Sequence, residues 1–264
     1  MRKRLLCPTL PLLNQRVLLP ENEANHAQRV LRLRNGEEVE ALDGRGHHIL
    51  GRLRMSDLGV QLEYVGPVLG EESIAGSSGV VPVDLEMAML KGEAMEWVVE
   101  KSTELGIRKL VPVVTDHTVI QIKNKGPAFF QERWQKIADQ ALKQCGRLEG
   151  LRVESPVSFE ELLRSRPIPA QTIRIWCDEQ KARGGAPTLA EWILKNPLSQ
   201  IPEVRVLIGP EGGWSQVERT RLSELSEESG GTIVPLSLGP LILRAETAAL
   251  LSMSLVSSFM RAQR

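Results

Sequence analysis

Two stretches near the end of the chain decide its fold: VRVLIGPEGGWSQVE (Val204–Glu218) and TIVPLSLGPLILRAETAALL (Thr232–Leu251). In each, a short run rich in Val, Ile and Leu breaks into a loop with Gly and Pro, and apolar residues then resume at helical spacing. This pattern is typical of a strand that feeds a loop at the carboxyl end of a parallel sheet, where ligands bind. We therefore expect both loops to border one pocket, with Glu211, Arg244 and Glu246 near it.

Strands and helices alternate from the middle of the chain onward. The expected strands span 83–90, 108–114, 172–177, 204–209 and 232–237, and the expected helices span 92–105, 129–145, 189–196, 215–229 and 245–260. The strands are apolar on both faces, which indicates a parallel sheet covered by helices on both sides. Ser215 and Glu218 fit a capping box at the start of one helix.

The first part of the chain has a different pattern of apolar and polar residues. Between Arg16 and Val68, short alternating segments are separated by Asn-Gly, Asp-Gly and Leu-Gly turns, with a short helix expected within 24–33. This is the pattern of a small antiparallel β-barrel. The segment GEESIAGSSGVVP (70–82) concentrates Gly and Ser and cannot bury itself. We therefore expect a barrel domain at residues 1–72, a linker at 73–82 and an α/β domain at 83–264.

Composition narrows the classes of function. The chain has 33 Lys plus Arg and 33 Asp plus Glu, so a nucleic acid would have to be held by a local patch. Cys7, Cys145 and Cys177 lie far apart, and the four histidines have no further ligand at metal spacing, so no metal is expected. There is no export signal and no run of about eighteen apolar residues. We therefore expect a cytoplasmic protein with no membrane partner.

The loop Gly209-Pro210-Glu211-Gly212-Gly213 suggests that main-chain amides approach a ligand. It lacks both the dinucleotide fingerprint and the phosphate-loop Gly-Lys-Ser/Thr. An amide-rich loop with one carboxylate and no cation suits a cofactor that has an adenosine and a positive centre. A tight strand-to-helix turn without a ligand is the alternative. Trp214 is expected to cover the ligand or stack on a base, and the other four tryptophans are expected in the core.

The second loop contains an apolar segment, Leu241–Leu243, that is too hydrophobic for a loop in solvent. We expect it to be buried, with Ile242 and Leu243 as the floor of an adenine pocket. Arg244 and Glu246 stand at the start of the last helix. Because an acidic side chain is favoured there by the helix dipole in any case, a structural ion pair is an alternative to a catalytic role.

Several segments resemble one known family. They are KGEAMEWVVEKSTELG, WQKIADQALKQCGR, LIGPEGGWSQVE, LSLGPLILRAETAAL and, near the start, HAQRVLRLRNGEEVEALDGRG. They resemble the RsmE family of SPOUT-class methyltransferases, which methylate N3 of a uridine in small-subunit (16S) ribosomal RNA. The resemblance covers both domains in the same order. It implies a PUA-like barrel that binds RNA, an α/β domain with a C-terminal trefoil knot, S-adenosylmethionine bound in the knot, and a homodimer.

The resemblance also implies which residues meet the cofactor. Carried over by position, the contacts fall on three segments, with Glu179 beside the first of them: Asp178, then Leu207, Ile208, Gly209, Glu211, Gly212 and Gly213, then Leu236, Leu238, Gly239 and Leu243. The chain departs from the family pattern at Leu241, where an arginine is common, and at Ala245, where a threonine is common. Arg244 is therefore the remaining candidate for a cation at the site.

Methylation of uridine N3 needs a base for the N3 proton and a donor for the charge that develops on the pyrimidine oxygens. Arg244 is the expected donor, and Glu211 and Glu246 are the two candidate bases. The expected contacts with ribosomal RNA or the small subunit are basic: Arg2, Arg4, Arg29, Arg32, Arg34, Lys91 and Arg147. Two alternatives stay open: a SPOUT methyltransferase for another RNA position, and a non-catalytic RNA-binding or ribosome-assembly protein of the same fold.

Overall fold

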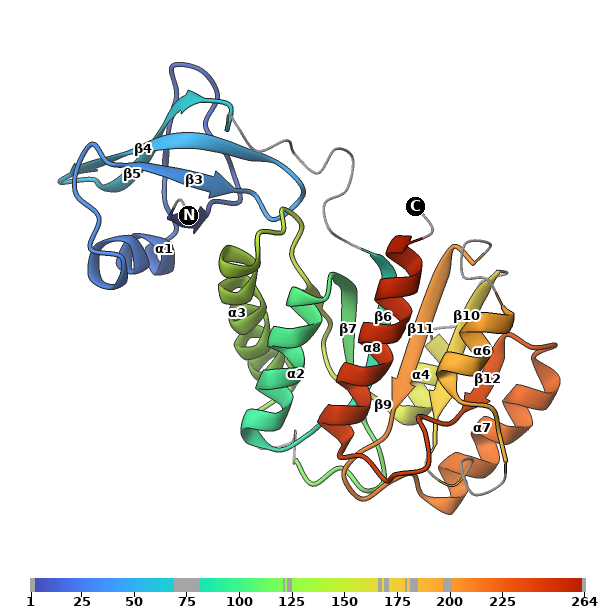
Figure 1. Ribbon diagram of the computed structural model, residues 1–264. Coiled ribbons are helices and arrows are strands. Elements are labelled where there is room, and N and C mark those ends of the chain that lie inside the picture. Colours follow the sequence, from blue (N-terminus) through green and yellow to red (C-terminus); the bar gives the residue numbers. More distant parts are fainter. Residues whose placement is uncertain are drawn as a thin grey trace. The chain divides into compact units, whose positions relative to one another are not determined.

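The computed structural model describes residues 3–68, 81–120, 122, 125–165, 168, 171–178, 180, 185–196 and 201–262 (Figure 1). The chain divides into two compact units, Met1–Val80 with Asp139–Gly150, and Val81–Ala138 with Leu151–Arg264. Residues 73–80 of the expected linker lie outside the described part of the chain, and its last two residues begin strand β6 (Val81–Ala88). Nothing in the sequence indicated that residues 139–150 would group with the first unit.

The first unit is built on a five-stranded sheet with the order β1-β3-β4-β5-β2. Its strands are β1 (Arg4–Leu6), β2 (Arg16–Leu18), β3 (Glu38–Leu42), β4 (His48–Ser56) and β5 (Gly59–Gly66). The pairs among β2 to β5 are antiparallel, as expected, whereas β1 pairs with β3 in parallel. The expected helix is a short α1 (Glu21–Asn25) continued by a π-helix, η1 (His26–Val30).

Residues 139–150 are held in the first unit by specific contacts. The Lys143 ammonium donates to Glu23 at 2.6 Å, and the other oxygen of Glu23 accepts the Leu6 amide at 2.9 Å. The Gly150 amide donates to the Gly44 carbonyl at 3.0 Å. Both carboxylate oxygens of Glu23 are thus satisfied, as a buried charge requires.

The second unit is built on one parallel sheet. Its described strands, in the order β12-β10-β11-β6-β7-β8 with β9 also paired to β7, form a seven-stranded sheet. Besides β6 they are β7 (Ile107–Val114), β8 (Arg152–Val153), β9 (Val157–Ser158), β10 (Thr172–Cys177), β11 (Glu203–Ile208) and β12 (Ile233–Leu236). Every pair is parallel, which confirms the expected α/β class.

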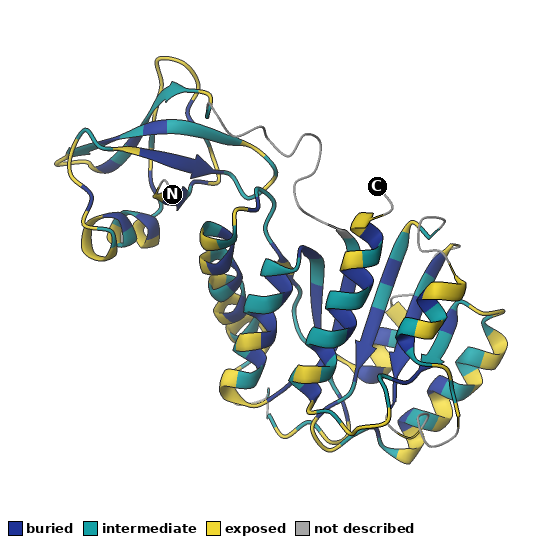
Figure 2. Ribbon diagram, in the orientation of Figure 1, coloured by how far each residue is buried: buried dark blue, intermediate teal, exposed yellow. Residues whose placement is uncertain are grey.

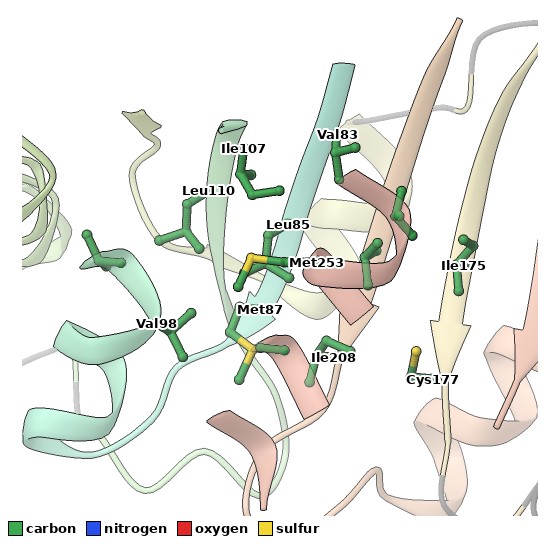
Figure 3. Packing of buried hydrophobic residues seen from close by; sticks show 14 of the residues in the cluster. Val83, Leu85, Met87, Val98, Ile107, Leu110, Ile175, Cys177, Ile208 and Met253 are labelled. Atoms are coloured by element: carbon green, nitrogen blue, oxygen red, sulfur yellow. The ribbon is translucent and has the colours of Figure 1, made fainter. Parts of the chain in front are cut away.

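Helices cover both faces of this sheet. They are α2 (Gly92–Glu104), α3 (Pro127–Cys145), α4 (Phe159–Ser165), α6 (Leu189–Lys195), α7 (Gln216–Glu228) and α8 (Ala245–Ala262). Figure 2 shows the central strands buried between them. Helices α2, α3, α6 and α8 share the larger core cluster, in which Met253 of α8 lies over Leu85 and Met87 of β6 (Figure 3). Helices α4 and α7 pack on the opposite face. No helix in the described ranges is both long and apolar enough to span a membrane.

One face of the sheet differs from the expectation that the strands would be apolar on both sides. Glu86 of β6 and Arg174 of β10 are buried and form a two-pronged ion pair, with N–O distances of 2.7 and 3.0 Å. Arg108 bridges Asp84 and Glu203 at 2.9 and 2.6 Å. The charged side chains were missed because isolated Asp, Glu and Arg in a Val/Leu run do not reveal that they will pair across the sheet.

Candidate functional site

The two glycine-containing loops meet around one pocket of about 230 Å³. It lies at the carboxyl ends of β10, β11 and β12, which are neighbours in the sheet. The lining comes from three segments and the start of α8: Cys177 and Asp178; Ile208 to Gly213; Ser237 to Gly239 with Leu241 to Leu243; and Ala245 with Ala248. The structure therefore brings together the segments that the sequence predicted to meet.

A wider hollow of about 690 Å³ runs along α7 and shares Asp178 with this pocket. Its other lining includes Gln180, Glu224 and Glu227, and it lacks the glycine loops. The smaller pocket has the main-chain groups that a ligand needs for specific recognition. We place the candidate site there.

The indole ring of Trp214 packs tightly against the first loop, residues 209–213. A Cβ at Gly209 would lie 2.9 Å from the indole ring, so only glycine fits at this position. The indole Nε1 donates to the Cys177 carbonyl at 3.1 Å, which ties the loop after β11 to the end of β10. Gly213 has φ +70°, a left-handed conformation that favours glycine.

Two of the expectations for the tryptophans are wrong. Trp214 is 1% exposed and lies in the core with Phe159 and Leu222, so it neither covers a ligand nor stacks on a base. Trp97, expected in the core, is 37% exposed. The glycine pair before Trp214 turns its side chain inward, and sequence spacing alone does not show the direction of such a turn.

The second loop also differs from its expectation. Leu243 is partly buried, but Leu241 and Ile242 are 76% and 70% exposed although they line the pocket. In the single chain the apolar segment is therefore not buried. Two large apolar side chains are thus exposed to solvent among the residues that line the pocket.

Asp178 forms part of the wall, but its carboxylate is already engaged. Both oxygens lie 3.3 Å from Nε of Arg219 on α7, and one accepts the Gln180 amide at 3.2 Å. Arg219 also donates to the Trp214 carbonyl at 2.5 Å. The pair thus fixes the end of β10 against the glycine loop. Sequence reasoning missed Arg219 because its partner lies in another strand-loop segment. Glu179 lies outside the described residues.

Cys177 lines the pocket beside Asp178. Burial raises the pKa of its thiol to about 12, and a weak contact with the Ser252 hydroxyl at 3.7 Å only partly offsets this. The thiol is therefore protonated at neutral pH and acts as a small apolar part of the wall rather than as a nucleophile.

Of the three expected catalytic residues, Glu211 lines the pocket, whereas Arg244 and Glu246 do not line it but flank the lining residue Ala245 in the sequence. Arg244 is 87% exposed, and its guanidinium is 4.0 Å from Glu246, whose side chain is 23% exposed. Glu211 is exposed, and its carboxylate accepts the Lys91 amide at 3.3 Å. Lys91, an expected RNA contact, is therefore next to the glycine loop at the N-terminus of α2.

Two of the residues expected at the cofactor do not line the pocket. Leu207 and Leu236 are fully buried, Leu207 in the cluster with Trp214 and Leu236 in the main core. Their side chains support the strand ends. Ile208, Gly209, Glu211, Gly212, Gly213, Leu238, Gly239, Leu243 and Asp178 all line it.

The basic residues of the first unit fall into two groups. Arg4 is buried and donates twice to Glu40, at 2.6 and 2.9 Å, and Arg147 is 6% exposed. A guanidinium held inside the unit does not reach a phosphate, so these two are corrected to structural residues. The residues Arg29, Arg32 and Arg34 are exposed, and none forms an ion pair with another described residue. Arg2 lies outside the described residues.

His117 is a residue at the site that the sequence did not reveal. Its Nδ1 lies 2.8 Å from the Gly213 carbonyl and 3.2 Å from the Gly212 carbonyl. Its position after a strand end, near the carboxyl edge of the sheet, was the only signal available. Among the described residues, no cluster of His, Cys, Asp and Glu could hold a metal ion.

Comparison with protein families finds two matches along the chain. A model of the RNA methyltransferase domain matches residues 78–257, and a model of the RNA methyltransferase PUA domain matches residues 19–62. The chain is also similar to proteins named ribosomal RNA small subunit methyltransferase E. The relative in Bacillus subtilis is 28% identical over 235 residues, covering 89% of this chain and 87% of the relative. The relative in Synechocystis is 28% identical over 261 residues, covering 98% and 78%.

Solved structures share the fold over nearly the whole chain. A Legionella pneumophila protein described as a methyltransferase, in complex with the bound cofactor SAM, superposes with a TM-score of 0.80 at 27% identity and covers 98% of both chains. A ribosomal RNA small subunit methyltransferase E from Neisseria gonorrhoeae, bound to S-adenosyl methionine, has a TM-score of 0.78 at 24% identity and the same coverage.

Proposed function

This chain belongs to the RNA methyltransferase family, and we propose that it transfers a methyl group from S-adenosylmethionine to N3 of a uridine in small-subunit ribosomal RNA. The observation that carries the proposal is the meeting of the loops 209–213 and 237–243 around one pocket. The resemblance of the chain to relatives named for methylation of small-subunit ribosomal RNA supports the substrate class.

The residues present fit this cofactor. Main-chain groups of Gly209 to Gly213 suit the polar groups of its amino acid and ribose, and Leu238 and Leu243 give an apolar wall for adenine. Asp178 stiffens the third wall through Arg219. Among the described residues that line the pocket, none is a lysine or an arginine, which suits a ligand with a positive sulfonium centre and no phosphate.

When bound, S-adenosylmethionine supplies an electrophilic methyl group. Uridine N3 becomes a nucleophile when it loses its proton, and negative charge then develops on the pyrimidine oxygens. Arg244 is the donor that meets this charge, because a guanidinium is protonated at any working pH. Its distance of 4.0 Å from Glu246 and its exposure make the pair a weak one, so the group is available to a base edge.

Glu246 is the better of the two candidate bases. A carboxylate removes a proton from so weak an acid only when it is poorly solvated. The Glu246 side chain is largely sheltered, whereas Glu211 is exposed and already accepts the Lys91 amide. Bound RNA would shelter Glu246 further.

We further propose that two copies associate over the second loop. Leu241 and Ile242 are exposed beside the pocket, and a second copy of this chain would cover them. Sedimentation of the purified protein tests this. A dimer at micromolar concentration is expected, and a monomer would contradict the proposal.

We infer that the last loop is threaded into a trefoil knot. Strand β12 lies at the edge of the sheet, yet α8, which follows it, packs on α2 and β6 farther in. Between them, the Ser237 amide donates to Pro187 and its carbonyl accepts from Leu189, so the segment entering the loop lies against the segment that leads into α6. Mechanical unfolding from the two termini tests the knot, because a knotted chain extends less than an unknotted one.

The remaining parts of the proposal concern RNA and location. We propose that a PUA-like domain at residues 1–72 binds RNA through Arg29, Arg32 and Arg34, and that Lys91 contacts RNA beside the pocket. The methyltransferase domain would span 83–264. A protein that modifies ribosomal RNA in this way would act in the cytoplasm.

The deciding experiment is to incubate the protein with labelled S-adenosylmethionine and either naked ribosomal RNA or small subunits that lack the modification, and then to identify the methylated nucleoside by mass spectrometry. We expect 3-methyluridine at one position. A methyl group on another base or on a ribose 2′-oxygen would assign a different RNA methyltransferase activity. Failure to bind S-adenosylmethionine would favour a non-catalytic RNA-binding protein.

A further inference from the structure

The turn after β7 is tied to the glycine loop and to the start of α7. The Ser215 hydroxyl donates to Asp116 at 2.6 Å, and the Asp116 amide donates to Glu218 at 3.0 Å. The turn itself is closed by Thr115 and Thr118, whose amide–hydroxyl and amide–carbonyl bonds are 2.9 and 3.0 Å long. These bonds hold the turn in one conformation. The turn follows β7, and no residue of β7 lines the pocket.

His117 lies in this turn and reaches the loop. Because both of its partners are carbonyl oxygens, Nδ1 carries the proton and donates to Gly213 at 2.8 Å and to Gly212 at 3.2 Å. A Cβ at Gly212 would lie 3.1 Å from Cβ of His117, so the histidine also packs directly against the loop.

The His117 side chain restrains the glycine loop by binding its carbonyl groups. The peptide between Gly212 and Gly213 is held at both ends, since its amide donates to the Pro210 carbonyl at 2.9 Å and its carbonyl accepts from His117. The next two carbonyls are also engaged, Gly213 by His117 and Trp214 by Arg219. The carbonyls of Gly212 and Gly213 therefore cannot turn into the pocket without breaking a bond to His117.

This arrangement leaves amides for a ligand. Within the described part of the chain, the amides of Glu211 and Gly212, two residues that line the pocket, have no hydrogen-bond acceptor. Amides that are held in place without an acceptor bind a ligand oxygen without the cost of ordering the loop first.

We propose that His117 is a positioning residue for the cofactor, a latch that holds the glycine loop in its binding conformation. The inference rests on the proposed function, because it takes S-adenosylmethionine as the ligand. It predicts that the imidazole N–H, rather than the ring itself, is what the loop requires.

The test compares His117→Ala with His117→Asn, because the asparagine amide places an N–H near the position of Nδ1. Val119→Ala is the matched control, since Val119 is an exposed residue two positions further along the same segment. Binding of S-adenosylmethionine is measured by calorimetry, and amide hydrogen exchange of residues 209–214 is measured without ligand. The thermal midpoint of each variant is recorded.

We expect His117→Ala to weaken binding about tenfold, equivalent to about 1.4 kcal/mol, and to speed exchange in the loop. His117→Asn should bind within about threefold of wild type, and Val119→Ala should be unchanged. Wild-type affinity and unchanged loop exchange in His117→Ala would overturn the proposal. An asparagine variant as weak as the alanine variant would also overturn it, by assigning the effect to ring packing.

The two proposals fail in different ways. If the wild-type protein does not bind S-adenosylmethionine, the proposed function fails. The latch is then judged by hydrogen exchange alone, which needs no ligand: faster exchange of the loop in His117→Ala supports it, and unchanged exchange overturns it.

Discussion

At the level of single residues, the site depends on side chains that hold the main chain around the pocket in place. Trp214 and His117 each bind the carbonyl of a residue that lines the pocket, and Arg219 binds the carbonyl of Trp214, which directly follows the glycine loop. The glycines could be predicted because they follow strand ends, and Arg244 was a candidate because it stands at the start of the last helix. Arg219 and His117 could not be predicted, because their partners are 41 and 95 residues away and neither forms a local motif with them.

Replacing Arg244 by alanine should lower the rate of methyl transfer by about 100-fold or more, because the donor for the developing charge is lost. The affinity for S-adenosylmethionine should stay within about threefold, since Arg244 does not line the pocket. Single-turnover kinetics and calorimetry measure the two effects. Arg221→Ala, an exposed arginine on α7, is the control. A rate within a few-fold of wild type, with RNA binding intact, would remove Arg244 from the mechanism.

Gly209→Ala should destabilise the protein and weaken cofactor binding, because the new Cβ would meet the buried indole of Trp214 at 2.9 Å. Overpacking of this kind costs about 1–3 kcal/mol. Urea unfolding measures the loss. Gly66→Ala is the matched control, since a Cβ there meets nothing within 4 Å and the residue has no left-handed backbone. Equal stability of the two variants would show that the loop gives way easily.

At the scale of elements, most of the second unit could be predicted. The strands and helices from 83 to 260 lie within a few residues of their expected ends, because their apolar periods are long and are closed by Gly or by a cap. The short elements β8, β9 and α4 were missed, since two to seven residues carry too little periodicity. The parallel pairing of β1 with β3 was also missed, because the sequence of neither strand specifies which distant strand it pairs with.

The capping box of α7 is the predicted feature whose geometry is clearest. The Ser215 hydroxyl accepts the Glu218 amide at 3.2 Å, and Glu218 accepts the Ser215 amide at 2.9 Å. Ser215→Ala should cost about 1 kcal/mol of unfolding free energy, and more if the bond to Asp116 contributes. Ser223→Ala, in the middle of the same helix, should be neutral or slightly stabilising. A neutral Ser215→Ala would show that the cap is dispensable.

At the scale of the whole molecule, the comparisons confirm the family resemblance that the motifs indicated. The pattern of two domains followed from a change of period along the chain. The assignment of 139–150 to the first unit could not be predicted, because it depends on pairs such as Lys143 with Glu23, which lie 120 residues apart.

Acid should weaken the first unit through Glu40. Burial would raise the pKa of this carboxyl, but hydrogen bonds from Arg4 and His48 outweigh burial and hold the pKa below its usual value. The folded state therefore binds this proton less readily than the unfolded state. Its stabilising contribution is present above about pH 4.5 and is lost as pH falls through the lower folded value. Urea unfolding between about pH 6 and pH 3 should show a smaller pH dependence in Glu40→Gln than in wild type. Equal pH dependence would contradict this account.

Binding of RNA should weaken steeply with salt despite the neutral total charge, because we propose that exposed arginines of the first unit bind RNA through its phosphates. Replacing Arg29, Arg32 and Arg34 together by glutamine should lower the salt slope by about 3 if each one contacts a phosphate. Replacing the buried Arg147 should not change the slope. A flat salt response in wild type would remove phosphate contacts from the account.

We propose that the two loops after β11 and β12 form one binding site for S-adenosylmethionine. The most direct measurement is hydrogen exchange of the full chain with and without this cofactor, at a concentration that calorimetry shows to be saturating. We expect one site per chain and slower exchange in both 209–213 and 237–243 when the cofactor is bound. Slower exchange in only one of the loops, or only in the hollow along α7, would contradict this proposal.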